Sequence, residues 1–265
     1  MHNAAFQEQE LDFVYVPFAV APENLKDAVA GVRALGLAGI NVTVPLKERV
    51  PELLDTLTAR AARLGAVNTL FWDGDQLCGD STDGPGFLAA LASADFTITP
   101  GMEALVLGAG GSARAVVDAL VQAGARVQVA NRTLARAEEL AARFGAVGAL
   151  PLETDALRPA LKTARLLVNT TSLGMHPEES EMPPVPEDAL HPELLVSDLI
   201  YNPYQSRLLA AATRRGCGVQ NGIEMLVQQG ALSFRHWTGR EAPTQVMRSA
   251  VQLFLTKTDT IRRLP

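Results

Sequence analysis

A lysine and an aspartate stand in two polar segments that precede a glycine-rich loop. Lys47 ends the stretch Asn41-Val-Thr-Val-Pro-Leu-Lys47, Asp83 lies in Gly79-Asp-Ser-Thr-Asp-Gly84, and the loop is Gly108-Ala-Gly-Gly-Ser-Ala113. When a nicotinamide cofactor moves hydride to a carbonyl group, the resulting alkoxide needs a proton. A lysine with a carboxylate partner can supply that proton, so these residues together predict reversible carbonyl reduction.

Each of the two residues has an ordinary explanation when it is taken alone. An aspartate just before a helix usually caps that helix, and a lone lysine is usually a solvated surface residue. Together they have another use, because burial favours the neutral amine while a neighbouring carboxylate favours the charged one. The pair Lys47 and Asp83 could therefore hold a lysine that both donates and accepts protons near neutral pH.

The glycine-rich loop has the context that a dinucleotide-binding fingerprint requires. It follows a predicted strand over residues 103–107 and opens a predicted helix over residues 113–123. Gly108 permits a tight turn, Gly110 permits close approach of a pyrophosphate, and the helix start offers free N–H groups. A turn rich in small residues without a ligand is the alternative. The candidate cofactor contacts in this loop are Gly108, Ala109, Gly110, Gly111 and Ser112.

The segment after the next predicted strand, residues 126–130, indicates which nicotinamide cofactor binds. An NAD-selective site usually carries Asp or Glu there for the ribose 2′-OH. This chain has Asn131-Arg-Thr-Leu-Ala-Arg136, with two guanidinium groups and no carboxylate. Arg132 and Arg136 can share one helix face and pair with a 2′-phosphate, which favours NADP. Solvated surface arginines are the alternative.

The elements that must position these residues alternate between strand-like and helix-like segments. Such alternation predicts α/β units with mainly parallel sheets. Strands are predicted over residues 12–17, 39–44, 67–72, 76–79, 103–107, 126–130, 166–169 and 194–199. Helices are predicted over residues 22–35, 47–64, 83–92, 113–123 and 134–144, and over most of the chain after Asn221-Gly222. Residues 175–192, rich in proline and acidic side chains, are predicted to form an exposed loop.

Composition excludes several classes of protein. A chain of 265 residues with 48% hydrophobic and 20% charged residues has an ordinary globular balance and is long enough for two domains. A net charge of −6 argues against a nucleic-acid-binding surface. No signal peptide or membrane-length apolar run is present, and Cys78 and Cys217 form no disulfide or metal pattern, so we expect a cytoplasmic protein.

The four histidines have no metal-ligand spacing, and no metal site is expected. Loop or surface positions are predicted for His2, His176, His191 and His236.

The segments quoted above, with Ala66-Val-Asn-Thr69 and Met225-Leu-Val-Gln-Gln229, closely resemble the shikimate dehydrogenase family over most of the chain. The resemblance implies a two-domain α/β fold, in which C-terminal helices return to the first domain. It places a substrate domain at residues 1–97, completed by 223–265, and a Rossmann NADP-binding domain at 98–222. It also implies a monomer or homodimer that reversibly reduces 3-dehydroshikimate to shikimate with NADPH, a step of aromatic amino-acid biosynthesis.

The resemblance assigns roles to individual residues. Lys47 is expected to protonate the ketone oxygen, and Asp83 to orient the substrate through a hydroxyl group. Uncharged groups suited to a polyhydroxylated substrate come from Thr43, Asn68, Tyr201 and Gln229. Further cofactor contacts are expected at Asn131, Arg132, Thr133, Arg136, Leu199 and Gly222, with the loop at residues 169–174 beside them. A packing role for Tyr201 and a plain turn at Gly222 are the alternatives.

The resemblance is incomplete at the front of the sequence. Family members usually begin with a strand and a Ser-x-Ser loop for the substrate carboxylate, just before the Met-His-Asn-Ala-Ala-Phe that opens this sequence. We therefore expect weak binding of shikimate and normal binding of the cofactor. Two other functions stay open: a quinate/shikimate dehydrogenase that uses NAD, and a cofactor-binding protein with weak activity.

Overall fold

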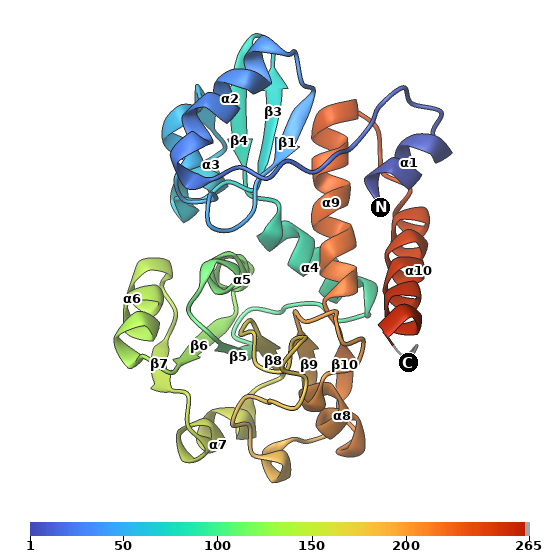
Figure 1. The fold of residues 1–265 in the computed structure, drawn as a ribbon. Helices are drawn as coiled ribbons and strands as arrows, with labels where there is room; N and C mark the ends of the chain where they lie inside the picture. The colour runs from blue at the N-terminus through green and yellow to red at the C-terminus, as the bar shows by residue number, and fades with distance from the viewer. Residues whose placement is uncertain (263–265) are drawn as a thin grey trace. The chain divides into compact units, whose positions relative to one another are not determined.

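A computed structural model describes the backbone of residues 1–262 and the side chains of residues 1–256. The chain divides into two compact units, which Figure 1 colours by position along the sequence. The first unit contains Met1–Gly86 and Val227–Val251, and the second contains Phe87–Leu226 and residues 252–262. The last three residues of the expected segment 223–265 lie outside the described residues.

The first unit is built on a four-stranded sheet in the order β1-β3-β4-β2. The pairs β1–β3 and β3–β4 are antiparallel, and β2 runs parallel to β4. An Asp-Gly turn joins β3 to β4, and Gly74 adopts the left-handed conformation that such a turn favours, with φ +59°. The strands are β1 (Gly39–Asn41), β2 (Thr56–Leu57), β3 (Thr69–Asp73) and β4 (Gln76–Asp80).

Helices cover this sheet through apolar faces. In α2, Leu25, Val29 and Val32 recur at helical spacing and join the buried cluster that contains Leu70 and Leu77 of the sheet. The short helix α3 is closed at both ends, because Thr58 accepts from Ala61 N–H and Gly65 ends it in the left-handed conformation. The helices of this part of the chain are α1 (His2–Glu8), η1 (Pro22–Asn24), α2 (Leu25–Ala34), η2 (Val50–Leu53), α3 (Ala59–Leu64) and α4 (Asp83–Ser93).

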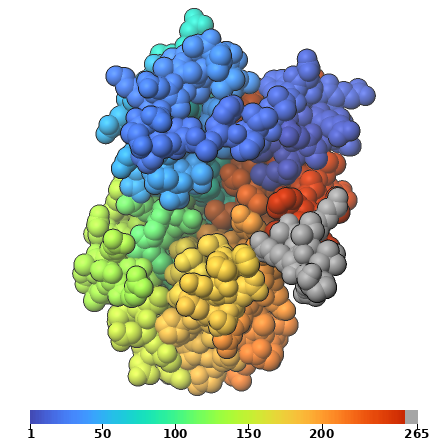
Figure 2. Space-filling model, in the orientation of Figure 1, coloured from blue at the N-terminus to red at the C-terminus, as the bar shows by residue number. Residues whose placement is uncertain are grey.

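Two predictions for the first unit are wrong. The strand predicted over residues 12–17 does not form, and no described strand lies alongside to pair with these residues. Most of their side chains and of those just after them are exposed, with Val14 76% and Phe18 63% exposed. Figure 2 colours the N-terminal segment that contains them blue. The helix predicted over residues 47–64 forms only in its last six residues, as α3 (Ala59–Leu64). Turns and η2, which contains Pro51, come first, and β2 then pairs with β4 before α3 begins.

The second unit is a parallel six-stranded sheet in the order β10-β9-β8-β5-β6-β7. The order reverses between β5 and β8, which makes the crevice at their carboxyl ends the usual ligand position of a doubly wound sheet. The prediction lacked β7, α7, α8 and β10. The strands are β5 (Glu103–Leu107), β6 (Arg126–Asn131), β7 (Gly148–Pro151), β8 (Leu166–Asn169), β9 (Leu195–Asp198) and β10 (Gly218–Gln220).

The connecting helices bury small and branched apolar residues against this sheet, such as Ala113, Val116 and Leu120 of α5. They are α5 (Gly111–Gln122), α6 (Leu134–Phe144), α7 (Thr154–Thr163), η3 (Glu187–Ala189) and α8 (Arg207–Arg214). The chain continues into α9 (Ile223–Thr238) and α10 (Thr244–Arg262).

The return of the C-terminal helices to the first unit is confirmed, since Ser233 and Trp237 of α9 form hydrogen bonds with β3. The two-domain α/β fold class is therefore confirmed as well. Among the described residues, no helix is both long and apolar enough to cross a membrane.

Candidate active site

Lys47 and Asp83 form an ion pair in the first unit. Lys47 Nζ lies 2.7 Å from Asp83 Oδ2, and the two side chains are 24% and 15% exposed. Asp83 is the first residue of α4, directly after the buried Thr82, and Lys47 ends its segment in the turns at residues 44–49. The backbone of Lys47 is held because its carbonyl accepts from Val67 N–H at 2.9 Å. An ammonium group and its carboxylate partner are thus held together at the edge of solvent.

Asn68 connects this ion pair to Thr82 and Thr69 through hydrogen bonds. Its Nδ2 donates to Asp83 Oδ1 and to Thr82 Oγ1, both at 2.9 Å. Its Oδ1 accepts from Thr82 N–H at 2.8 Å and from Thr69 Oγ1 at 3.0 Å. Because Asn68 is only 3% exposed, its amide orientation is determined by these bonds. Asp83 therefore uses one oxygen for Asn68 and the other for Lys47.

Gln229 reaches the same place from α9. Its Oε1 accepts from Asn68 Nδ2 at 3.4 Å. The helix comes close because Gly86 of α4 has no side chain: a Cβ there would lie 2.6 Å from Gln229 N. Lys47, Asp83, Asn68 and Gln229 are thus brought together from four separate segments.

The described residues show no hydrogen bond from the other two predicted substrate residues, Thr43 and Tyr201, to this cluster. Thr43 is exposed, two residues after β1 ends at Asn41. Tyr201 belongs to the second unit and is 41% exposed.

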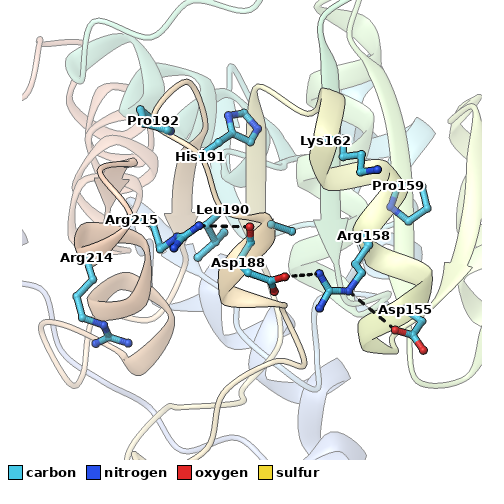
Figure 3. Close-up of a pocket in the computed structure, with 11 residues that line it drawn as sticks. Asp155, Arg158, Pro159, Lys162, Asp188, Leu190, His191, Pro192, Arg214 and Arg215 are labelled. Atoms are coloured by element: carbon cyan, nitrogen blue, oxygen red, sulfur yellow. Dashed lines mark hydrogen bonds and ion pairs between the residues drawn. The ribbon is translucent and has the colours of Figure 1, made fainter.

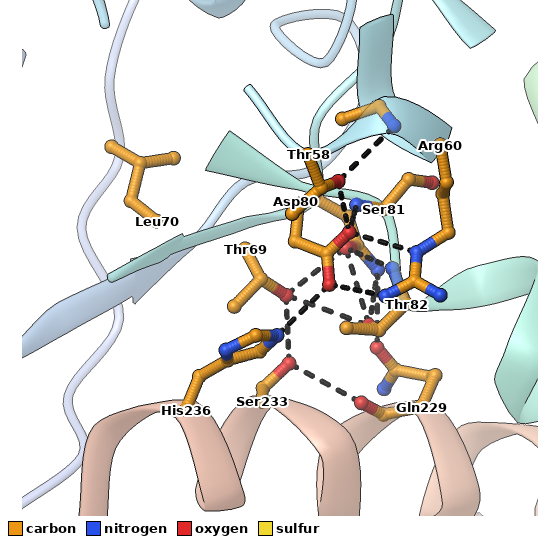
Figure 4. A network of polar contacts seen from close by, with 12 residues as sticks. Thr58, Arg60, Thr69, Leu70, Asp80, Ser81, Thr82, Gln229, Ser233 and His236 are labelled. Carbon is orange, nitrogen blue, oxygen red and sulfur yellow. Dashed lines mark hydrogen bonds and ion pairs between the residues drawn. The ribbon is translucent and has the colours of Figure 1, made fainter. Parts of the chain in front are cut away.

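A fully buried carboxylate, Asp80, ends β4 three residues before Asp83 (Figure 4). Its Oδ1 accepts from Thr58 Oγ1 at 2.6 Å, Arg60 Nε at 2.8 Å and Ser81 N–H at 2.8 Å. Its Oδ2 accepts from Arg60 Nη2 at 2.7 Å and lies 2.9 Å from His236 Nε2. Burial alone would raise the pKa of Asp80, but the bonds from Arg60, His236 and Thr58 outweigh it and hold that pKa well below the usual range.

Asp80, Arg60, Thr69, Thr82, Ser233 and His236 were not among the predicted site residues. Only part of this cluster is visible in the sequence: Gln229, Ser233 and His236 are four and three residues apart, the spacing of one helix face.

The glycine-rich loop in the second unit leaves room for a phosphate group. Gly110 precedes α5 and Gly111 begins it, and a Cβ at either position would meet no atom within 4 Å. Packing therefore does not explain these glycines, whereas close approach of a pyrophosphate to the helix N-terminus would. Gly108 differs, because its φ is +108° and a Cβ there would lie 2.5 Å from Thr170 Oγ1. The loop fits a dinucleotide.

Arg132 and Arg136 follow β6 and are exposed. No ion pair or hydrogen bond of either guanidinium group is recorded among the described residues, so both are available to an anion. Asn131 instead stabilises the turn, because its Nδ2 donates to the carbonyl of Thr133 at 2.9 Å. This end of the strand fits a 2′-phosphate and offers no carboxylate to a ribose hydroxyl.

Leu199 and Gly222 meet at the end of β9. A Cβ on Gly222 would lie 2.0 Å from the carbonyl oxygen of Leu199, so this glycine is required by packing whether or not a ring lies nearby. The preceding residue, Asp198, is fully buried and accepts from Asn169 Nδ2, Ile200 N–H and Ser206 Oγ. Burial raises the pKa of this carboxyl, since no cation is among those donors.

The prediction of loop or surface positions for the histidines is wrong for His2 and His236. His2 is 4% exposed and stacks on Tyr15, and desolvation together with the charged N-terminus lowers its pKa to about 4. His236 is partly buried against Asp80 and Phe71. Among the described residues, no group of three His, Cys, Asp or Glu side chains is placed to hold a metal ion.

A pocket of about 960 Å³ lies elsewhere in the second unit, between α7, η3 and α8 (Figure 3). Its walls are largely charged, but Arg158 pairs with Asp188 at 2.7 Å and Arg214 pairs with Glu187 at 3.0 Å. The carboxyl-terminal ends of α7 and α8 also contribute there, and helix C-termini disfavour anions. The residues that line this pocket include none of the glycine-rich loop at residues 108–113, and neither Lys47 nor Asp83.

Three family models match successive parts of the chain. They are the shikimate dehydrogenase substrate binding domain at residues 1–70, shikimate / quinate 5-dehydrogenase at 90–188, and the shikimate 5′-dehydrogenase C-terminal domain at 222–252.

Individual proteins match over nearly the whole chain. A shikimate dehydrogenase (NADP(+)) of Methanopyrus kandleri is 47% identical, with 95% of this chain and 89% of that protein covered. The crystal structure of shikimate 5-dehydrogenase from Listeria monocytogenes with shikimate and NAD has a TM-score of 0.90 at 35% identity, covering 94% of this chain and 90% of that one. The crystal structure of the Thermus thermophilus enzyme with NADP(H) and shikimate has a TM-score of 0.85 at 40% identity, covering 95% and 92%.

The expected lack of a first strand and a Ser-x-Ser loop stays a prediction. The matched domains, the identities and the shared fold lead to one conclusion: the chain belongs to the shikimate dehydrogenase family.

Proposed function

We propose that the chain is an NADP-dependent shikimate dehydrogenase, which reversibly reduces 3-dehydroshikimate to shikimate in the shikimate pathway. The observation that carries this proposal is the Lys47–Asp83 ion pair at 2.7 Å, with Asn68 and Gln229 beside it, in a chain of this family. The arrangement joins a proton donor to uncharged groups that suit a substrate rich in hydroxyl groups.

In this proposal the cofactor supplies or accepts the hydride, and the residues of the first unit handle the proton. Lys47 Nζ donates to the substrate oxygen during reduction and accepts from the hydroxyl group during oxidation. Asp83 keeps the ammonium group in place through Oδ2 and accepts from a substrate hydroxyl. Asn68 and Gln229 contact further hydroxyl groups. Thr43 and Tyr201 would complete the substrate contacts.

The cofactor contacts in the proposal are those of the second unit. Gly108, Ala109, Gly110, Gly111 and Ser112 would bind the pyrophosphate, and Asn131, Arg132, Thr133 and Arg136 the adenosine 2′-phosphate. Leu199 and Gly222 would lie beside the nicotinamide. The open space before α5 and the absence of a recorded partner for the two arginines among the described residues support this assignment.

Residues 1–97 with 223–265 would act as the substrate domain, and residues 98–222 as the NADP domain. We place the enzyme in the cytoplasm as a monomer or homodimer, in keeping with the two free cysteines.

Steady-state turnover tests the proposal. Shikimate with NADP should give a higher kcat/KM than quinate with NAD. Preference for quinate and NAD would instead support the second candidate, a quinate/shikimate dehydrogenase, which the shikimate / quinate family model keeps open. NADP binding without turnover would leave only a cofactor-binding protein.

A further inference from the structure

Three side chains on α9 bind residues at one end of the β3–β4 pair of the first sheet. Gln229, Ser233 and His236 share one face of the helix, and in Figure 4 all three project from it toward the sheet. Gln229 bonds Asn68, and His236 bonds Asp80. Ser233, which is fully buried, bonds Thr69 Oγ1 at 2.7 Å. We call these three residues the α9 ladder.

The sheet side of the ladder is itself rigid. Thr69 and Asp80 are directly opposite each other in the β3–β4 pairing. Asn68 N–H also donates to the carbonyl of Asp80 at 3.0 Å. The partners of the ladder therefore keep fixed distances from one another, and the helix can bind all three in one register only.

Within the α9 ladder, His236 is the residue farthest from Gln229. Seven residues of helix separate the two, about 10 Å at 1.5 Å per residue, so the His236 ring lies two turns of α9 away from the Gln229 amide. Its ring stacks on Phe71 with centroids 4.0 Å apart, and its Nε2 meets the carboxylate of Asp80. This carboxylate keeps four other donors, from Thr58, Ser81 and twice from Arg60, when His236 is removed. The bond is thus not needed to satisfy Asp80.

We propose that His236 is a positioning residue for the substrate. Its bond to Asp80 sets the register of α9 and so holds the amide of Gln229 beside Asn68 and Asp83. The inference rests on the proposed function, because it assumes that Gln229 contacts the substrate. It adds a residue that touches neither substrate nor cofactor but determines how well shikimate binds.

The test is a double-mutant cycle between His236 and Gln229, read as kinetics with shikimate and NADP. His236→Phe keeps an aromatic ring for Phe71 and removes the Nε2 donor. We expect it to raise the KM for shikimate about three- to tenfold, the scale of coupling within one network, while kcat and the KM for NADP stay within about twofold. His236→Gln, which returns an N–H donor at similar reach, should restore most of the binding.

The decisive comparison is with Gln229→Ala, which should itself raise the KM for shikimate. In that background His236→Phe should have no further effect on kcat/KM, because no amide remains to be positioned. Equal effects of His236→Phe in both backgrounds, or no effect of Gln229→Ala, would overturn the proposal. Failure of the wild-type chain to turn over shikimate would instead overturn the proposed function.

Two further variants test whether any change on α9 has the same effect and replace His236→Phe if that variant does not fold. Arg235→Ala alters the neighbouring residue of α9, which is 59% exposed and pairs with Glu241, and should leave the KM for shikimate unchanged. If His236→Phe fails to fold, Ser233→Ala removes the middle rung of the ladder and should show the same KM rise and the same dependence on Gln229. An additive effect of Ser233→Ala would count equally against the ladder.

Discussion

The two candidate sites differ in how far their polar groups are already satisfied. In the first unit, the side chains of Asp83, Asn68 and Asp80 are hydrogen-bonded to other groups of the protein, and only a small fraction of each is exposed. In the second unit, Gly110 and Gly111 face open space, and Arg132 and Arg136 have no recorded ionic partner among the described residues. One site is preorganised by the chain itself, and the other leaves its donors for a ligand.

This difference matches the demands on each site. A group that transfers a proton must be held within hydrogen-bonding reach of the reacting oxygen, which requires fixed partners. A phosphate group brings its own charge and acceptors, so exposed arginines and free N–H groups suffice until it binds. Substitutions in the first unit should therefore affect catalysis and stability, and those in the second should affect cofactor binding while the fold survives.

The largest effect is expected at Lys47, the proposed proton donor. Lys47→Ala should lower kcat by about 10²–10⁴-fold, the usual range for general acid–base catalysis, and change KM much less. Steady-state kinetics with shikimate and NADP measure both values, and Lys162→Ala, an exposed lysine of the second unit, is the control. A variant with normal kcat and a raised KM would make Lys47 a binding residue.

A smaller effect is expected at the cofactor phosphate. Arg132→Asp should reduce the preference for NADP over NAD about ten- to a hundredfold, because a charge-assisted bond is worth about 1.5–3 kcal/mol. The ratio of kcat/KM for the two cofactors measures the change. Arg126→Asp, at the other end of β6, should leave that ratio alone. An unchanged ratio in Arg132→Asp would mean that the 2′-phosphate does not bind at this position.

The buried Asp80 should affect stability. Asp80→Asn removes the buried negative charge that Arg60 and His236 contact and should lower the free energy of unfolding at pH 7 by about 1.5–3 kcal/mol. The pKa of Asp80 is lowered by folding, so its contribution is complete above the pKa of the unfolded chain and is lost as pH falls below it. Urea unfolding at pH 7 and near pH 3 should show a smaller deficit at the lower pH. A deficit that grows on acidification would contradict this sign.

The sequence predicted those elements that local pattern determines. β5, α6 and β8 have the predicted bounds, because short apolar runs or helical periodicity end at clear polar or glycine positions. Residues 12–17 are rich in the aromatic and β-branched side chains that favour strands, but strand formation depends on a partner elsewhere in the chain. The same holds for Thr56–Leu57, which becomes a strand only by pairing with β4.

The sequence likewise predicts some residues of the candidate site and not others. Lys47, Asp83, Asn68 and Gln229 stand in recognisable motifs, and the structure brings them together. The cluster around Asp80 is visible in the sequence only as the helical spacing on α9, since its contacts join Asp80 to Arg60 and His236 from distant segments of the chain. Its contacts exist only once β3, β4 and α9 have packed.

The smallest effect on stability is expected at Gly110 of the second unit, where the effect on cofactor binding can be measured separately. Gly110→Ala places a methyl group in open space, so the free energy of unfolding should change by less than about 0.5 kcal/mol. Gly222→Ala is its matched control, because its methyl group would clash with the carbonyl oxygen of Leu199 and should clearly lower the melting temperature. If the space before α5 receives the pyrophosphate, Gly110→Ala should nevertheless weaken NADP binding, measured by calorimetry on a fully folded protein. Normal NADP affinity in that variant would mean that the open space serves no phosphate, and that the glycines of this loop need another explanation.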